Sequence, residues 1–158
     1  MDRIDSSLIA LRKILRATEM FGRQLAQSAG LTAVQFRVLQ VVAENGQTTA
    51  KEISQRMRVS QATVTALVDK LVNRGMAVRE KSQTDRRQTN IVVTGLGRST
   101  IEGAPDPLQQ RYVRKFQALE DWEQALLVAS LERVAAMLDA EDLDAAPVLD
   151  SGDFRQPG

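Results

Sequence analysis

Residues 48–98 read TTAKEISQRMRVSQATVTALVDKLVNRGMAVREKSQTDRRQTNIVVTGLGR, and their first half predicts two short helices joined by a tight turn. Thr49 and Glu52 form a capping box at the start of the first helix, and Ser60 caps the second. Apolar residues at helical spacing mark the inner sides: Ile53 and Met57 in the first helix, and Val64, Leu67, Val68 and Leu71 in the second. Gly75 ends the second helix. This order indicates a helix-turn-helix unit.

Two β-prone runs follow the second helix. They span residues 76–81 and 88–93 and enclose a polar loop, residues 82–87, so they predict a hairpin. A helix-turn-helix followed directly by a hairpin is a winged helix. We therefore expect a mainly α fold that contains a winged helix-turn-helix lobe with a two-stranded wing.

The segments on either side of this lobe are expected to be helical. Apolar residues between Ile4 and Leu25 form two stripes at helical spacing, which predicts a helix over about residues 5–28. A single small domain buries one stripe, so the second indicates a partner helix, such as one from another subunit. Thr32 and Gln35 form a capping box for a further helix, which stops before Gly46.

The C-terminal third is expected to form two more helices and a tail. A helix capped by Thr94 is interrupted around Pro105 and Pro107, and the helical pattern resumes over residues 106–118 and 121–139. We expect three regions. They are a dimerisation region (residues 1–30 and 100–140), a DNA-binding lobe (31–99) and an acidic, flexible tail (141–158).

The composition excludes several classes of protein. None of the 158 residues is cysteine or histidine, which excludes disulfides, thiolate nucleophiles, imidazole acid–base catalysis and metal sites with these ligands. No apolar run reaches the roughly 18 residues of a membrane span. The opening MDRIDSSLIALRKIL carries charges inside its apolar pattern, unlike a signal peptide. We therefore expect a cytoplasmic protein, associated with the nucleoid when bound to DNA, with no cofactor, no membrane partner and no enzymatic activity.

The charge is unevenly distributed along the chain. Residues 51–100 hold ten basic and four acidic residues, a net charge of +6, whereas residues 1–50 carry +2 and residues 101–158 carry −7. A basic middle segment in an otherwise acidic or neutral chain is typical of a nucleic-acid contact. The alternative is chance clustering on solvated helix faces, and charge alone does not separate the two.

Residues 48–98 resemble the MarR family of bacterial transcriptional regulators along their whole length. The resemblance rests on Ala50-Lys51-Glu52-Ile53, Val59-Ser60-Gln61-Ala62-Thr63-Val64-Thr65, Leu67-Val68-Asp69-Lys70-Leu71, Arg74-Gly75, Asp85-Arg86-Arg87 and Val93-Thr94. The Asp-Arg-Arg wing followed by a strand end and a threonine is its most specific element. The resemblance implies a homodimer that binds a pseudo-palindromic operator in double-stranded DNA as a transcriptional regulator, and it favours a repressor.

The helix that begins after Ser60 is the predicted recognition helix. Its outward residues near the start are Gln61, Ala62, Thr63, Thr65 and Ala66. Glutamine can pair with adenine, and alanine or the threonine methyl can pack on a thymine methyl. Basic residues surround the unit: Lys51, Arg56, Arg58, Lys70 and Arg74. Some family members carry a base-contacting arginine where this chain has Ala66, so we expect weak guanine readout. The alternative is a row of small solvated residues.

The wing carries the second group of predicted DNA contacts. Asp85 and Arg87 are expected to lie on the same side of an extended segment, two residues apart, so that they can pair and stiffen the tip, and Arg86 then points the other way. An arginine on a protruding loop suits the minor groove of A·T-rich DNA, and the resemblance implies this role. Arg79 and Lys81 on the incoming strand are predicted phosphate contacts. The alternative is a solvated tip with a surface ion pair.

Five aromatic residues lie on the predicted helices: Phe21, Phe36, Tyr112, Phe116 and Trp122. The resemblance implies a small anionic or aromatic effector between the DNA-binding lobe and the dimer helices, which some of these rings could line. Core packing is the favoured interpretation of the rings. A different class of function, a winged helix that binds proteins without specific affinity for DNA, stays open. The net charge of +6 and Arg86 favour DNA.

Overall fold

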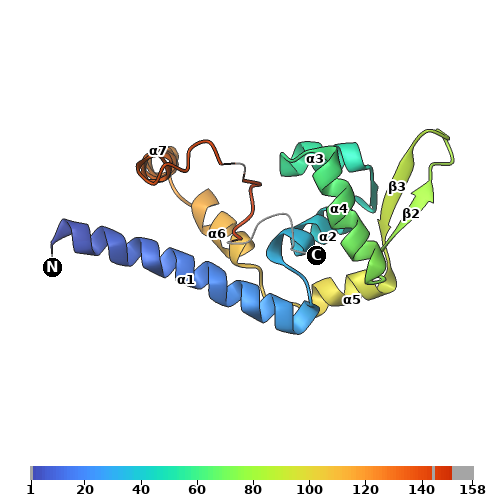
Figure 1. Cartoon of the computed structure of the whole chain (residues 1–158), viewed down its shortest axis with the longest axis horizontal. Helices are drawn as coiled ribbons and strands as arrows, with labels where there is room; N and C mark the ends of the chain where they lie inside the picture. The colour runs from blue at the N-terminus through green and yellow to red at the C-terminus, as the bar shows by residue number, and fades with distance from the viewer. Residues whose placement is uncertain (1, 144, 151–158) are drawn as a thin grey trace. The chain divides into compact units, whose positions relative to one another are not determined.

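The computed structural model describes residues 2–143 and 145–150, and the chain divides into two units. The first unit is Met1–Pro105 together with Ala146–Gly158, and the second is Asp106–Ala145. Among the described residues, no helix is long and apolar enough to cross a membrane. The predicted mainly helical fold with a winged helix-turn-helix is confirmed (Figure 1).

The first unit begins with the long helix α1, Arg3–Ala29. The Asp2 side chain caps it by accepting from the backbone N–H of Asp5, and Gly30 ends it with a φ of 67°. Only its last turns carry buried apolar residues, namely Phe21, Leu25 and Ala29. The helix therefore joins the core of the first unit through its C-terminal end alone.

Helix α2, Ala33–Asn45, is the centre of that core. Its capping box is confirmed, because the Thr32 hydroxyl accepts from the backbone N–H of Gln35 and the Gln35 side chain accepts from that of Thr32. The helix is buried on nearly every side, with Val38, Leu39 and Val42 fully enclosed. It contacts α3 (Ala50–Met57), α4 (Gln61–Asn73), α5 (Gly95–Gly103) and the sheet.

The wing hairpin is part of a three-stranded antiparallel sheet. Strand β2, Ala77–Lys81, pairs with β3, Thr89–Val93, so that Ala77 lies opposite Val93 and Lys81 opposite Thr89. A two-residue strand β1, Gln47–Thr48, pairs with the other edge of β3, giving the order β1-β3-β2. The hairpin was predicted, whereas β1 was not, since two residues are too few to show a strand period.

Gly97 allows α5 to approach the base of the hairpin. A Cβ added there would overlap the carbonyl oxygen of Met76 and lie 2.6 Å from Cγ2 of Val93. The Thr94 hydroxyl accepts from the backbone N–H of Gly97 and donates to the carbonyl of Gly75. These contacts fasten both ends of the hairpin to the helical body.

The second unit contains α6, Leu108–Gln117, and α7, Asp121–Met137. No residue of either helix is buried. The rings of Tyr112 and Phe116 lie 5.7 Å apart, and Trp122 is 66% exposed. Core packing is thus confirmed for Phe21 and Phe36 but wrong for Tyr112 and Trp122, because two helices alone do not enclose large rings.

Residues 146–150, the described end of the chain, pack within the first unit. Ala146 is buried, and a carboxylate oxygen of Asp150 accepts from the backbone N–H of Val34 at 3.1 Å. The predicted flexible tail covered residues 141–158. Of these, residues 144 and 151–158 lie outside the described part of the chain.

Candidate nucleic-acid interface

The helix-turn-helix is held by local side-chain contacts. The predicted box of Thr49 and Glu52 caps α3, and the Ser60 hydroxyl caps α4 by accepting from the backbone N–H of Thr63 at 3.1 Å. Between them, Arg58 adopts a φ of 53°, and Ser54 donates to the carbonyl of Val59 at 2.6 Å. The turn therefore fixes the angle between the two helices, which contact each other along their inner sides.

Helix α4 has a buried face and an exposed face, as predicted. Val64, Leu67, Val68 and Leu71 are buried. Gln61, Ala62, Thr65 and Ala66 are exposed, and Thr63 is half-buried. The Thr65 hydroxyl donates to the carbonyl of Gln61 at 2.9 Å, so this hydroxyl already has a partner for its hydrogen. The exposed start of α4 is a small, uncharged surface of one amide and several methyl groups.

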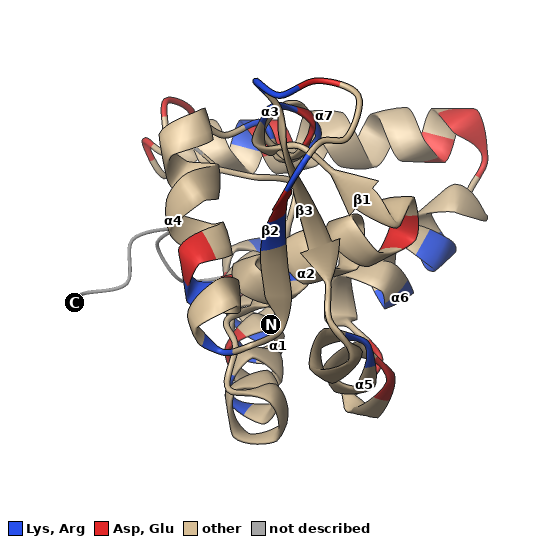
Figure 2. Cartoon of the chain, turned by 90° about the vertical axis from the view of Figure 1, so that its right-hand side faces the viewer, with Lys and Arg blue, Asp and Glu red and all other residues tan. Residues whose placement is uncertain are grey.

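Three lysines on the helix-turn-helix and the wing are free to bind an anion. Lys51 on α3, Lys70 on α4 and Lys81 at the end of β2 are exposed, and the described residues provide none of them with an ion pair. Figure 2 shows basic segments along β2 and on the loop that joins β2 to β3. Unpaired lysines thus lie on α3, on α4 and at the end of β2.

Two arginines of the predicted site are held against other parts of the first unit. Arg79 on β2 donates to a carboxylate oxygen of Asp69 at 2.6 Å and to the carbonyl of Thr65 at 3.4 Å, which links the wing to α4. The guanidinium of Arg74, at the far end of α4, lies over Gly30. Sequence reasoning missed Asp69, because only the fold brings the two elements together.

The loop of the wing, residues 82–88, is a tight hydrogen-bonded turn. The Ser82 hydroxyl accepts from the backbone N–H groups of Thr84 and Asp85. The Asp85 carboxylate accepts from the backbone N–H of Arg87 at 3.0 Å, and the backbone carbonyl of Asp85 accepts from the backbone N–H of Gln88. The predicted ion pair between the Asp85 and Arg87 side chains is wrong, because the chain turns at residues 86–87 and is not extended.

Arg86 and Arg87 are both exposed on this loop. Neither guanidinium pairs with a carboxylate in the described part of the chain. Asp85 shapes the loop through backbone hydrogen bonds and does not neutralise an arginine. The wing therefore presents two unpaired positive charges at its tip.

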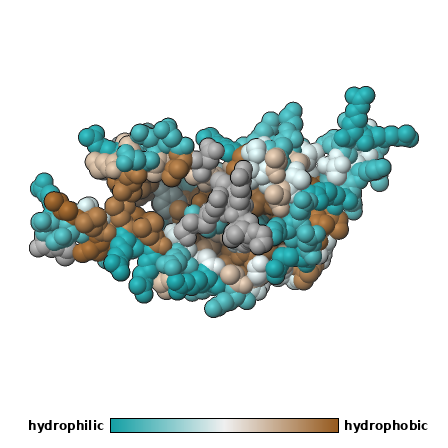
Figure 3. All heavy atoms as spheres, in the orientation of Figure 1, coloured by the Kyte–Doolittle hydropathy of each residue, from teal (hydrophilic) through white to brown (hydrophobic). Residues whose placement is uncertain are grey.

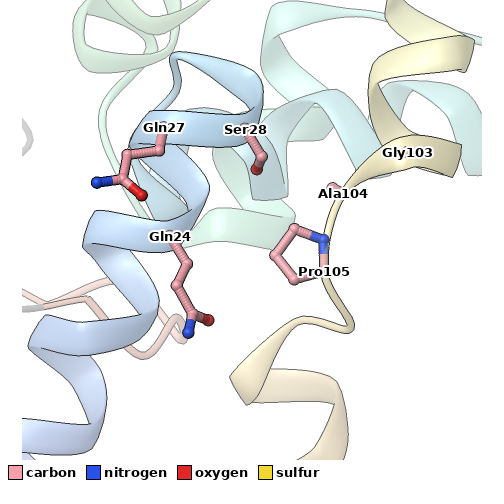
Figure 4. Close-up of a pocket in the computed structure, with 6 residues that line it drawn as sticks. All are labelled: Gln24, Gln27, Ser28, Gly103, Ala104 and Pro105. Carbon is pink, nitrogen blue, oxygen red and sulfur yellow. The ribbon is translucent and has the colours of Figure 1, made fainter.

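A shallow groove of about 630 Å³ opens elsewhere on the first unit (Figure 4). The last turns of α1 line one side with Gln24, Gln27 and Ser28, and the end of α5 lines the other with Gly103, Ala104 and Pro105. Among the described residues, no aromatic or charged side chain lines it. Its polar groups are two amides and a hydroxyl, so it offers neutral hydrogen bonds.

The lobe thus has the geometry of a winged helix, with a basic hairpin beside the exposed helix of a helix-turn-helix. In sequence, residues 29–88 match the model of the MarR family. This match covers α2, the helix-turn-helix and the wing up to residue 88. The chain is 28% identical over 130 residues to YcgE of Bacillus subtilis, described as an uncharacterised HTH-type transcriptional regulator. This alignment covers 82% of the chain and 84% of the relative.

Two solved MarR-like structures share this fold. A MepR-like protein complexed with pseudoligands superposes with a TM-score of 0.59 at 23% identity, covering 87% of this chain and 97% of the other. A mutant MarR from Escherichia coli complexed with operator DNA superposes with a TM-score of 0.52 at 23% identity, covering 85% and 99%. The chain is thus similar to MarR-family transcriptional regulators in the sequence of its winged helix-turn-helix and in its fold.

Proposed function

We propose that this protein is a MarR-family regulator that represses transcription as a homodimer bound to a pseudo-palindromic operator. The observation that carries the proposal is the combination of two features on one lobe. The start of α4 is exposed and uncharged, and unpaired cations lie on α3, α4 and the wing beside it. The first feature suits base edges and the second suits phosphates.

In this proposal α4 enters the major groove with its N-terminal end. Thirteen residues give a helix roughly 20 Å long, and the groove is about 12 Å wide. Gln61 reads an adenine, and Ala62 and the Thr65 methyl contact thymine methyls. Ser60 and Thr63 border the backbone N–H groups at the start of α4, which attract a phosphate. Ala66 offers no hydrogen bond, so guanine readout is weak.

The remaining predicted contacts follow the DNA backbone and the minor groove. Lys51, Lys70 and Lys81 neutralise phosphates, since each is exposed and unpaired within the described chain. Arg86 enters the minor groove, where the negative potential of an A·T-rich flank attracts it. Asp85 holds the loop in the shape that presents Arg86, and Arg87 beside it lies near the backbone.

The proposed dimer explains the apolar surface that the single chain exposes. On α1, Ile4, Leu8, Ile14 and Leu15 are each more than half exposed, and Figure 3 shows apolar atoms over this end of the helix. On α7, Trp122, Leu126 and Met137 are likewise exposed. Residues 1–30 and 100–140 would thus form the dimerisation region, and residues 31–99 the DNA-binding lobe. Two copies of α4 then meet half-sites about 10 bp apart.

The groove beside α1 and α5 is the proposed location for a small-molecule effector. It lies at the C-terminal end of α1, opposite the exposed start of that helix. Helix α1 is part of the proposed dimerisation region. A ligand there contacts both α1 and the end of α5, so it can alter how the dimer presents its two lobes.

Measurement of DNA affinity against salt concentration tests the proposed function. The probes are a duplex that the full chain selects from a random-sequence library and a scrambled duplex of equal length. We expect tighter binding to the selected duplex, and affinity for both duplexes that falls as salt rises. A chain that enriches no duplex and shows no salt dependence is instead a winged helix that binds another kind of partner.

A further inference from the structure

The recognition helix and the long N-terminal helix meet at their C-terminal ends. Gly30 ends α1 with a φ of 67°, and Arg74 is the C-cap of α4. A Cβ added at Gly30 would overlap Nη2 of Arg74 and lie 2.8 Å from its Cζ and 3.3 Å from Nη1. The guanidinium of Arg74 therefore occupies the space that a side chain at position 30 would need.

The end of α1 is a favourable place for this cation. The last carbonyl groups of a helix have no intrahelical partner and carry a partial negative charge. The last turn of α1 itself contains no basic residue. Within the described chain, the Arg74 guanidinium makes no ion pair with a carboxylate. Its position over Gly30 thus supplies a positive charge that the last turn of α1 lacks.

The contact joins two helices that have different roles in the proposed function. Helix α1 belongs to the proposed dimerisation region, and α4 is the proposed recognition helix. Arg74 lies roughly 20 Å from the start of α4, where base contacts are proposed. Its guanidinium is directed to the end of α1, and the unpaired lysines already supply cations for phosphates.

We propose that Arg74 is a positioning residue that holds the end of α4 against the end of α1, so that the orientation of α1 sets that of the recognition helix. Gly30 is the other half of this contact, because only a residue without a side chain leaves room for the guanidinium. The proposal rests on DNA binding through α4. It gives Arg74 a different role from a phosphate contact.

Two substitutions disturb the contact in opposite ways. Arg74→Ala removes the guanidinium together with its charge. Gly30→Ala keeps the charge but displaces the guanidinium, since the end of the arginine side chain must move away from the new Cβ. A control for the strain of a positive φ is Gly46→Ala, because Gly46 has a φ of 74° and nothing lies within 4 Å of a Cβ there. Its ψ of −55°, against 22° at Gly30, makes alanine more strained at position 46, so this control overstates the backbone strain at Gly30.

The experiment measures affinity for the selected and the scrambled duplex at several salt concentrations, with circular dichroism and ultracentrifugation to establish folding and assembly. We expect Arg74→Ala and Gly30→Ala each to lower affinity for the selected duplex by roughly 2- to 30-fold. Affinity for the scrambled duplex and the salt slope should stay at the wild-type values. Gly46→Ala should retain the wild-type preference for the selected duplex. The double variant Gly30→Ala/Arg74→Ala should lose no more affinity than whichever single variant binds the selected duplex less tightly.

A different pattern overturns the proposal. If Arg74→Ala weakens binding to both duplexes alike and lowers the salt slope by about one, Arg74 is a phosphate contact. If Gly30→Ala has the same effect as Gly46→Ala, displacement of the guanidinium has no consequence. If Gly30→Ala does not fold, the salt slope of Arg74→Ala still decides. A wild-type chain with no preference for either duplex contradicts the proposed function itself, which these variants do not test.

Discussion

Arg86 shows how one side chain depends on the backbone that carries it. The residue lies in a seven-residue loop in which the side chains of Ser82 and Asp85 accept hydrogen bonds from backbone N–H groups. The Asp85 carboxylate thus binds a backbone N–H group and pairs with neither Arg86 nor Arg87, so the positive charges of both arginines are not neutralised. A positive charge at the end of a narrow hairpin suits the minor groove, whose width and potential depend on sequence.

Arg86→Ala tests this role. We expect it to reduce affinity for the selected duplex by ~1–3 kcal/mol and to flatten the preference for A·T pairs at the flanks, because it removes a groove contact. Lys70→Ala serves as the control, since loss of a phosphate contact should weaken binding to all sequences and lower the salt slope by about one. Equal weakening of both duplexes by Arg86→Ala would make the wing an electrostatic anchor only.

We expect Asp69 to affect DNA binding through its ion pair with Arg79. The 2.6 Å ion pair is partly exposed, so Asp69→Asn should lower the free energy of unfolding by only ~0–1 kcal/mol. The substitution also releases Arg79 and adds one unit of positive charge beside the recognition helix. We expect tighter binding to the scrambled duplex and a smaller preference for the selected one, measured by titration of both. An unchanged preference would show that the pair does not orient the wing.

At the scale of helices and strands, the sequence predicted those features that depend on residues close together in the chain. The capping boxes at Thr32 and Thr49, the Ser60 cap and the buried stripe of α4 all depend on residues three or four positions apart, and all are confirmed. Strand β1, the link from Arg79 to Asp69 and the approach of Arg74 to Gly30 depend on elements that meet only in the fold. The ion pair predicted for Asp85 was wrong because the loop conformation is not visible in residue spacing.

Ser60→Ala tests whether the predicted cap holds the recognition helix. The Ser60 hydroxyl accepts from the backbone N–H of Thr63, so its loss should lower the free energy of unfolding by ~0.5–2 kcal/mol. Ser60→Gly is the control and should cost only a few tenths of a kcal/mol, since glycine also suits an N-cap. Chemical denaturation measures both. Equal destabilisation by the two substitutions would mean that Ser60 contributes through some other contact.

At the scale of the whole molecule, the exposed apolar residues are the feature that one chain cannot explain. Ile4, Leu8 and Leu15 on α1 are 68%, 58% and 64% exposed, although their spacing is that of a buried stripe. An apolar surface of this kind marks a protein interface. The two stripes of the sequence indicate a partner helix, but the geometry of the proposed dimer depends on contacts between chains that no single-chain pattern describes.

Leu8→Asp tests the proposed dimer. We expect the wild-type chain to be a dimer at micromolar concentration, and the variant to shift toward monomer because an unpaired charge would be buried in the interface. Lys13→Glu on the same helix is the control and should affect assembly less, since it exchanges one exposed charge for another. Sedimentation velocity measures the species. A wild-type chain that sediments only as a monomer would contradict the proposed dimer.

Sequencing of the duplexes that the purified full chain selects from a random-sequence library tests most directly that this protein reads DNA as a symmetric pair of winged helices. We predict one enriched pseudo-palindrome with half-site centres about 10 bp apart and A·T-rich flanks where Arg86 would lie. An unenriched library, or a single half-site without its inverted partner, would contradict this.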